Sequence, residues 1–139
     1  MDFFLPDSIK YNTDFRDHKS FENRRAESSR LIRKYNDRVP IVIEPSRELN
    51  IDKKKFLSPG DISVSQFMYI IRKRIRGLSP AQAIFLFTEN NTFPPSSTLM
   101  SDVYYNYHNR DGMLYVKIGL ESVYGGMTQE GTSKQASRR

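Results

Sequence analysis

The sequence of 139 residues contains no cysteine and only two histidines. Without cysteine the chain has no disulfide, no thiol nucleophile and no zinc site built on thiolates. His18 and His108 are too far apart for a short-range histidine motif, so we expect neither a metal nor another cofactor. No recognisable nucleophile motif includes these histidines or Asp14 and Asp111, and the sequence therefore argues against an enzyme.

Long apolar runs are also missing. No stretch approaches the roughly 18 consecutive apolar residues that a membrane-spanning helix needs. The N-terminus carries the acidic Asp2 and a short apolar run, Phe3-Phe4-Leu5, which is unlike a signal peptide. Residue 2 is not glycine and the last residue is not cysteine, so neither myristoylation nor prenylation is encoded. These features predict a soluble cytoplasmic protein.

Basic residues outnumber acidic ones, 22 to 16, which gives a net charge of +6. The basic residues occur in short runs such as Lys53-Lys54-Lys55 and Arg72-Lys73-Arg74, which we interpret as solvated faces that would also favour anionic membranes or acidic peptides. A nucleic-acid binder would interleave aromatic and basic residues on one strand. Phe85 and Phe87 stand instead in an uncharged run, so we expect no nucleic-acid partner.

The first part of the chain predicts two helices and a hairpin. Residues 1–12 have no regular pattern and are expected to be a flexible extension. Thr13-Asp14 predicts a short helix to residue 18, and Ser20 is a suitable N-cap for a helix to residue 35. That helix should bury a narrow stripe, formed by Phe21, Ala26, Leu31, Ile32 and Tyr35. Residues 39–44 and 54–57 then predict two strands of a hairpin.

The second part predicts a helix, a strand, a helix and a strand. Ser63 and Gln66 form a capping box before apolar residues at helical spacing, and Gly77 is expected to end that helix. The apolar residues 84–87 predict a strand that is central or covered on both faces. Ser97 should cap a short helix, and residues 113–118 form the last strand. This order predicts an α+β fold, a ubiquitin-like β-grasp with a four-stranded mixed sheet and two added N-terminal helices.

The end of the chain carries the pair Gly125-Gly126 directly after Tyr124, followed by small and polar residues. Two glycines at such a place are usually a hinge, because glycine adopts backbone angles that other residues avoid. Ubiquitin-like modifiers, however, present a C-terminal glycine to their activating enzymes. Residues 121–139 are expected to be a flexible arm after a domain that spans residues 13–120.

Several segments, in order and at compatible spacing, resemble the autophagy-related ubiquitin-like modifiers, the family of the light-chain-three and GABA-receptor-associated proteins. The resemblance covers about residues 15–125. Its most specific stretches are Phe21-Glu22-Asn23-Arg24-Arg25, residues 34–44, Asp52-Lys53-Lys54-Lys55-Phe56-Leu57, Gln66-Phe67 with residues 71–75, Phe93-Pro94-Pro95 and Glu121-Ser122-Val123-Tyr124-Gly125.

The resemblance implies a C-terminal processing pathway. A cysteine protease would cut after Gly125, and activating and conjugating enzymes would transfer this glycine to phosphatidylethanolamine. A ubiquitin-style end would instead place the cut after Gly126. The protein would then be a tag rather than a catalyst, a monomer that is cytoplasmic before lipidation and associated with autophagosomal membranes after it.

The resemblance also implies a groove for aromatic-x-x-aliphatic peptides. The aromatic anchor would be bordered by Glu27, Leu31, Pro40, Lys55, Leu57 and Met113, and the aliphatic anchor by Phe56, Pro59, Ile62, Phe67 and Ile70. Phe67 and Ile70 could equally be core residues. Lys55 and Arg38 suit acidic residues that flank such peptides. Met113 stands where the family usually has Phe, and Ser58 where it has an apolar residue. An adaptor that binds peptides but is never conjugated is the alternative.

Overall fold

The computed structural model describes residues 10–121, so the expected processing residues Tyr124, Gly125 and Gly126 lie outside the described part of the chain. The helices are α1 (Asp14–Asp17), α2 (Phe21–Lys34), α3 (Val64–Arg72) and α4 (Met100–Tyr107). The strands are β1 (Arg38–Pro45), β2 (Asn50–Ile51), β3 (Lys55–Pro59), β4 (Ile75–Arg76), β5 (Ile84–Thr88) and β6 (Leu114–Leu120).

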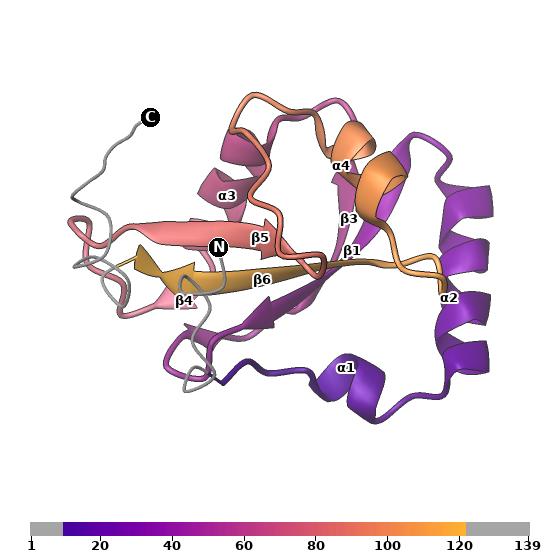
Figure 1. Ribbon diagram of the computed structural model, residues 1–139, viewed down its shortest axis with the longest axis horizontal. Coiled ribbons are helices and arrows are strands. Elements are labelled where there is room, and N and C mark those ends of the chain that lie inside the picture. Colours follow the sequence, from indigo (N-terminus) through magenta and orange to yellow (C-terminus); the bar gives the residue numbers. More distant parts are fainter. Residues whose placement is uncertain (1–9, 122–139) are drawn as a thin grey trace.

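The main sheet has four strands in the order β3-β1-β6-β5 (Figure 1). β1 runs parallel to β6 and antiparallel to β3, and β5 is antiparallel to β6, so the sheet is mixed. Helix α3 packs on one face, where Ile41, Ile43 and Val116 meet its buried Phe67 and Ile71. The predicted α+β β-grasp fold and the predicted hairpin, β1 with β3, are confirmed.

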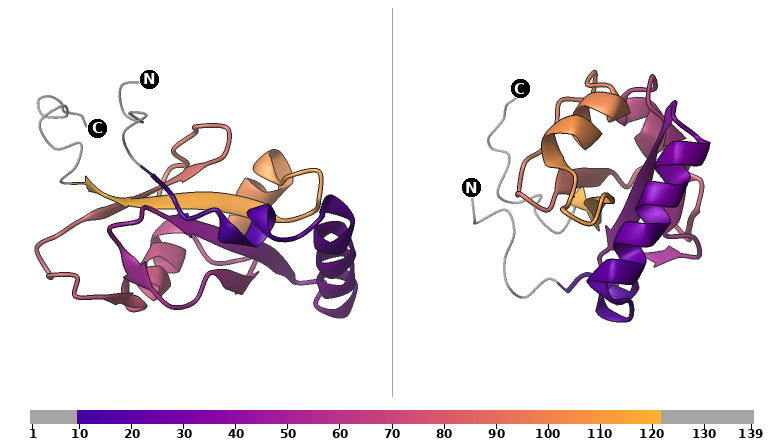
Figure 2. Two further views of the ribbon diagram at one scale, coloured as in Figure 1. Left: turned by 90° about the horizontal axis from the view of Figure 1, so that it is seen from below. Right: turned by 90° about the vertical axis from the view of Figure 1, so that its right-hand side faces the viewer.

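The other face of the sheet carries the residues that alternate with this core, and α1 lies over part of it (Figure 2). Val42 and Tyr115 form a small second cluster with Met113, against which Phe15 of α1 packs. Next to it, Arg16 contacts the buried Glu44 through two 2.8 Å hydrogen bonds, and Lys117 approaches the same carboxylate at 2.8 Å. Helix α1, which buries none of its residues, is thus held by one aromatic ring and one guanidinium.

Both N-terminal helices begin near the predicted residues, and the Ser20 side chain accepts a hydrogen bond from the Asn23 backbone N–H as an N-cap should. The expected burial of α2 is wrong, because Ser28 is its only buried residue. Phe21, Ile32 and Tyr35 are exposed. Polar contacts attach α2 instead. The Ser28 hydroxyl donates a hydrogen bond to the backbone carbonyl oxygen of Asp111. The Arg25 guanidinium donates one to the backbone carbonyl oxygen of Arg110, the residue before Asp111.

Helix α3 confirms the capping box, since Ser63 accepts from Gln66 N–H and the Gln66 side chain accepts from Ser63 N–H. Its predicted end is wrong. The helix stops at Arg72, and Ile75 pairs in strand β4 with Ile51 of β2. Burial of both isoleucines in the core favours this pairing over a further helical turn. Gly77, at φ 74°, follows the strand instead of ending the helix.

Strand β5 lies at the edge of the sheet. Leu86 faces the core and Tyr11 packs on Phe87 on the other side, so the strand is covered on both faces, which is one of the two arrangements that its apolar run predicts. The prediction for α4 needs correction. Helix α4 has Leu99 as its N-cap residue, without a side-chain cap, and Ser97 lies in the preceding turn. The Leu99 backbone bridges to Ser63, so the start of α4 is fixed by the neighbouring chain rather than by a capping hydroxyl.

Candidate functional site

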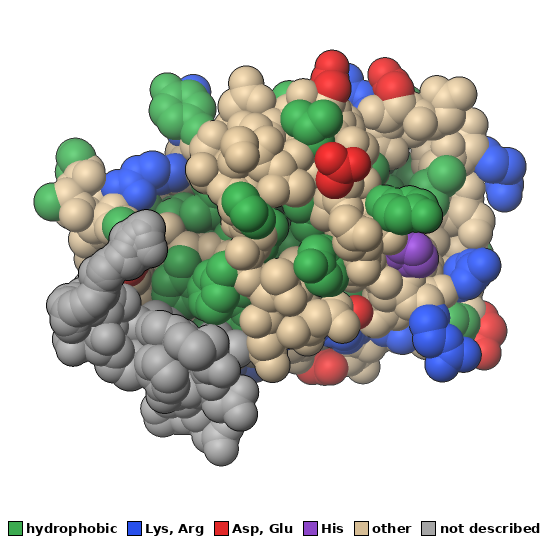
Figure 3. All heavy atoms as spheres, turned by 45° about the horizontal axis from the view of Figure 1, so that its top comes forward, with side chains coloured by type: hydrophobic (Ala, Val, Ile, Leu, Met, Phe, Trp, Pro, Cys, Tyr) green, Lys and Arg blue, Asp and Glu red, His purple; other side chains and the backbone are tan. Residues whose placement is uncertain are grey.

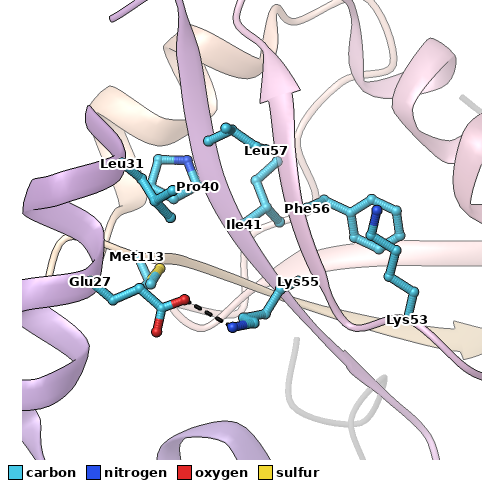
Figure 4. A pocket seen from close by; sticks show the side chains of 9 residues that line it. All are labelled: Glu27, Leu31, Pro40, Ile41, Lys53, Lys55, Phe56, Leu57 and Met113. Carbon is cyan, nitrogen blue, oxygen red and sulfur yellow. Dashed lines mark hydrogen bonds and ion pairs between the residues drawn. The ribbon is translucent and has the colours of Figure 1, made fainter. Parts of the chain in front are cut away.

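A cavity of about 250 Å³ opens between α2 and β3, and we refer to it as the α2–β3 cavity (Figure 4). Three elements, α2, β1 and β3, supply most of its lining, because α2 stands beside the start of β1, next to the edge strand β3 (Figure 2). Lys53 and Met113 come from the segments just before β3 and β6. The lining residues are Glu27, Leu31, Pro40, Ile41, Lys53, Lys55, Phe56, Leu57 and Met113. All six residues expected around an aromatic anchor are therefore brought together, with Phe56 beside them.

The mouth of this cavity is polar and its interior is apolar. Glu27 accepts hydrogen bonds from Lys55 at 2.9 Å and from Lys19 at 3.1 Å. Partial burial would raise the pKa of Glu27, but the two lysines outweigh it and lower the pKa below its ordinary value, so the carboxylate stays ionised. The side chains of Leu31, Pro40 and Met113 lie together on one side of this ion pair (Figure 4). An apolar hollow rimmed by charge suits a flat side chain with a polar edge.

Arg38 lies beside the cavity rather than in its lining. It is exposed at the first residue of β1 and donates a 3.2 Å hydrogen bond to the Leu57 carbonyl oxygen. Lys53 was not predicted, yet it lines the cavity with its ammonium group 5.0 Å from the centre of the Phe56 ring. Lys53 precedes Lys55 by two residues, and side chains two apart in an extended segment point to the same side, so the sequence could have predicted that Lys53 lies beside Lys55. Ile41, also missed, has no such signal because it reads as a core strand residue.

The residues expected around an aliphatic anchor separate into core and surface. Phe67 is only 1% exposed and belongs to the core, where its ring meets that of Phe56 edge-on at 5.9 Å. Ile70, by contrast, is 41% exposed on the outer side of α3. Pro59 and Ile62 are half-buried. A ligand could therefore touch Ile70, Pro59 and Ile62, whereas Phe67 could only support them through Phe56.

The two departures from the family pattern, Met113 and Ser58, are both buried. Met113 is 1% exposed and joins the α2–β3 cavity to the cluster beneath α1, since it packs with Val42 and Tyr115. Ser58 is 4% exposed, and its hydroxyl donates to the Pro59 carbonyl oxygen at 3.0 Å. A thioether is more flexible than an aromatic ring, so the back of the cavity can adapt its shape.

A second, wider hollow of about 600 Å³ adjoins the first one and shares Lys53 and Lys55 with it. It is lined by Asp14, Phe15, His18, Lys19, Asp52, Lys53, Lys54 and Lys55, so four lysines face two carboxylates. This excess of positive charge next to the apolar cavity suits an acidic stretch of a peptide ligand. Among residues 10–121, no cluster of three or more His, Cys, Asp or Glu side chains could hold a metal ion.

Within the described part of the chain, no helix has the length and apolar character to cross a membrane.

Comparison with known proteins gives one consistent family. The family model described as "Autophagy protein Atg8 ubiquitin like" matches residues 23–125. Autophagy-related protein 8 of Cochliobolus heterostrophus (strain C5) is 46% identical over 114 residues, which cover 80% of this chain and 94% of that protein.

Two solved structures share the fold. The Atg8 of Trypanosoma brucei superposes with a TM-score of 0.70 at 34% identity, over 79% of this chain and 96% of its own. The Atg8 of Plasmodium falciparum, in complex with a P. falciparum Atg3 peptide, gives a TM-score of 0.65 at 36% identity, over 75% and 93%. The predicted family resemblance is thereby confirmed: the chain belongs to the Atg8 family of ubiquitin-like autophagy proteins.

Proposed function

We propose that this protein is a conjugated tag of autophagy which recruits partners through the α2–β3 cavity. Processing by a cysteine protease leaves Gly125 at the C-terminus, and activating and conjugating enzymes join it to phosphatidylethanolamine. The protein passes from the cytoplasm to autophagosomal membranes by this step and acts there as a monomer. Its own part is to be recognised and to bind, while the covalent chemistry belongs to the enzymes.

The observation that carries the binding half of this proposal is the position of the cavity beside an open sheet edge. β3 is the outer strand of the sheet, so its outward backbone groups can pair with an added strand. A peptide that extends the sheet along β3 brings one side chain to the α2–β3 cavity. The next anchor, three residues on, then falls toward Pro59, Ile62 and Ile70. The Atg8 of P. falciparum, a relative of this chain, was solved in complex with a P. falciparum Atg3 peptide, which supports a peptide ligand at this site. By analogy, one such ligand would be a peptide of the Atg3 that occurs together with the present protein.

The conjugation half rests on the end of the family match. β6 runs directly into Glu121, four residues before Gly125, and the match to the family model stops at residue 125. The residues after it lie outside the shared pattern, as expected for a segment that is removed. This favours a conjugated protein over the alternative, a peptide-binding adaptor that is never processed.

Leu31 and Ile32 offer a matched test of the cavity. They are neighbours on α2, but Leu31 lines the cavity whereas Ile32 is exposed outside the set of lining residues. Leu31→Ala should weaken binding of an aromatic-x-x-aliphatic peptide by about 2 kcal/mol if Leu31 contacts the anchor. Ile32→Ala should leave the affinity unchanged. Calorimetric titration measures both, and equal affinities of the two variants would reject the cavity as the peptide site.

A further inference from the structure

The sheet face opposite α3 ends in a group of aromatic residues, which we call the aromatic face: Phe85 and Phe87 of β5, Phe93 of the following loop, and Gly119 of β6. The rings of Phe85 and Phe87 stack at 5.7 Å, and Phe93 lies 5.3 Å from Phe87. Phe93 is 44% exposed. Hydrophobic side chains gather on this side of the molecule with few charges among them (Figure 3).

Gly119 makes room for this arrangement. It pairs with Phe85 across β5 and β6, and a β-carbon at residue 119 would collide with the Phe85 ring. The outer end of the Phe85 ring therefore lies over the backbone of β6 at Gly119 and extends the apolar surface to the end of the sheet. α1 covers only the opposite end of this sheet face, around Val42 and Tyr115. Within the aromatic face Phe87 is buried beneath Tyr11, whereas Phe85 is half-buried and Phe93 is exposed. The apolar surface that continues beyond α1 is therefore formed by Phe85 and Phe93.

The first described residues lead to this surface. The backbones of Tyr11 and Ser46 form a β-bridge, and Asn12 N–H donates to the Pro45 carbonyl oxygen at 2.8 Å. Arg47 N–H donates to the Lys10 carbonyl oxygen at 2.9 Å, which fixes the chain one residue earlier. The Tyr11 ring meets that of Phe87 edge-on at 5.9 Å. The first described residues thus lie at the border of the aromatic face.

We infer that the N-terminal segment binds back onto the aromatic face through Phe3-Phe4-Leu5. Tyr11 follows Leu5 by six residue positions, a span of up to about 20 Å when extended. Phe85 is two strand residues from Phe87, about 7 Å, so the segment can reach it. A short tether gives such a segment an effective concentration in roughly the millimolar range, which favours it over an untethered partner. The aromatic face is therefore the docking site of the chain's own apolar N-terminus.

This interaction is independent of the peptide cavity and of lipidation. It would keep three large apolar side chains away from water, and away from other apolar surfaces, while the protein is in solution. Because the occupant is part of the same molecule, docking does not depend on protein concentration. That property separates it from docking of a second copy.

The absence of cysteine allows a direct test on the full chain. Asp2→Cys introduces a single thiol for a nitroxide label, which broadens the amide NMR signals of nearby residues. We expect loss of the signals of Phe85, Phe93 and Gly119, and little effect at Tyr69, an exposed residue of α3. The matched control replaces Phe3, Phe4 and Leu5 with Ser in the labelled protein. This keeps the tether length and should restore the lost signals.

Three results would overturn the inference. The first is equal broadening in the labelled protein and in its serine control. The second is equally strong broadening of the same signals when labelled, unenriched protein is mixed with unlabelled, isotope-enriched protein, since the occupant would then be a second copy. The third is broadening that is unchanged by the serines in solution while the apolar residues are needed for binding to phosphatidylcholine vesicles, since a membrane would then be the partner of the segment.

Discussion

The Nζ atom of Lys55 lies 2.9 Å from Oε2 of Glu27, so an ion pair joins β3 to α2 across the mouth of the α2–β3 cavity. The second oxygen of the same carboxylate binds Lys19 at 3.1 Å. One acidic residue therefore engages two of the lysines that could otherwise meet an acidic ligand. Ligand charge and Glu27 should compete for these lysines.

Glu27→Gln should strengthen binding of a peptide that carries acidic residues before its aromatic anchor. The gain should be about 0.5 kcal/mol, the size typical of partly exposed ion pairs, and it should shrink at high salt. Calorimetry with this peptide and with a neutral-flank version measures it. An equal gain for the neutral version would contradict a charge mechanism.

The pH dependence of this effect has a definite sign. The lysines hold the pKa of Glu27 below its ordinary value, so the ion pair persists above that lowered pKa and is lost as the pH falls through it. The affinity of the unmodified protein for the acidic peptide should then approach that of Glu27→Gln. Titrations at decreasing pH, down to the limit set by the peptide's own carboxylates, would show this convergence.

Arg16→Met should strongly destabilise the fold. Its guanidinium makes 2.8 Å contacts with Glu44, which is 1% exposed, and with Glu89. Its pKa is subject to burial, which lowers it, but the two glutamates outweigh burial and raise it. Removal of Arg16 leaves a buried carboxylate with Lys117 as its remaining ion-pair partner, and the free energy of unfolding should fall by about 3 kcal/mol.

Lys19→Met is the control for that experiment. It removes a cation three residues further along, but its ion pair is partly exposed, and the cost should stay below about 1 kcal/mol. Urea unfolding followed by circular dichroism measures both variants. Similar losses of stability in the two proteins would show that Glu44 does not depend on Arg16.

The unmodified protein should lose stability at high pH because of Tyr115, and Tyr115→Phe should abolish this loss. Tyr115 is fully buried, and its hydroxyl donates to the Asp111 carboxylate at 2.5 Å. Burial, followed by this hydrogen bond, raises the pKa of Tyr115 well above its ordinary value. Tyrosine in the unfolded chain ionises near pH 10, so the unfolded state releases the proton first and the free energy of unfolding should fall above about pH 10.

Tyr115→Phe should lower the free energy of unfolding at neutral pH, because the Asp111 carboxylate loses a hydrogen-bond donor. Above about pH 10, however, the free energy of unfolding should fall less steeply with pH than in the unmodified protein. Tyr105→Phe, at an 81% exposed position, is the control and should leave the slope unchanged. Urea unfolding series on both sides of pH 10 provide the comparison. A slope that persists in Tyr115→Phe would assign the effect to other groups.

Gly125→Ala should block removal of the C-terminal segment and lipid attachment. A β-carbon at this position would crowd the scissile carbonyl in the protease channel, whereas Gly126→Ala should be tolerated among the leaving residues. Intact mass spectrometry of the processed protein distinguishes the two cut sites by one glycine. Processing that continues in Gly125→Ala but stops in Gly126→Ala would move the site to Gly126.

Local sequence signals determined the elements that depend on neighbouring residues. The capping box of Ser63 and Gln66 starts α3 because both hydrogen bonds close within four residues. The β-branched residues of β1 form a strand for similarly local steric reasons. The ordered family motifs identified the fold and the cavity residues, because Glu27, Lys55 and Met113 keep their places in that fold.

Tertiary structure decided what depends on distant residues. α3 ends early because Ile75 gains a buried partner in Ile51, 24 positions away. Phe67 lies in the core and Ile70 on the surface although both belong to the same apolar pattern, since only the packing of α3 on the sheet selects which side is covered. The apolar run of β5 does not reveal that it is an edge strand. Burial of an apolar side chain depends on contacts between elements that are distant in the sequence. The sequence therefore indicates which residues can be buried, and the tertiary structure determines which of these residues are buried.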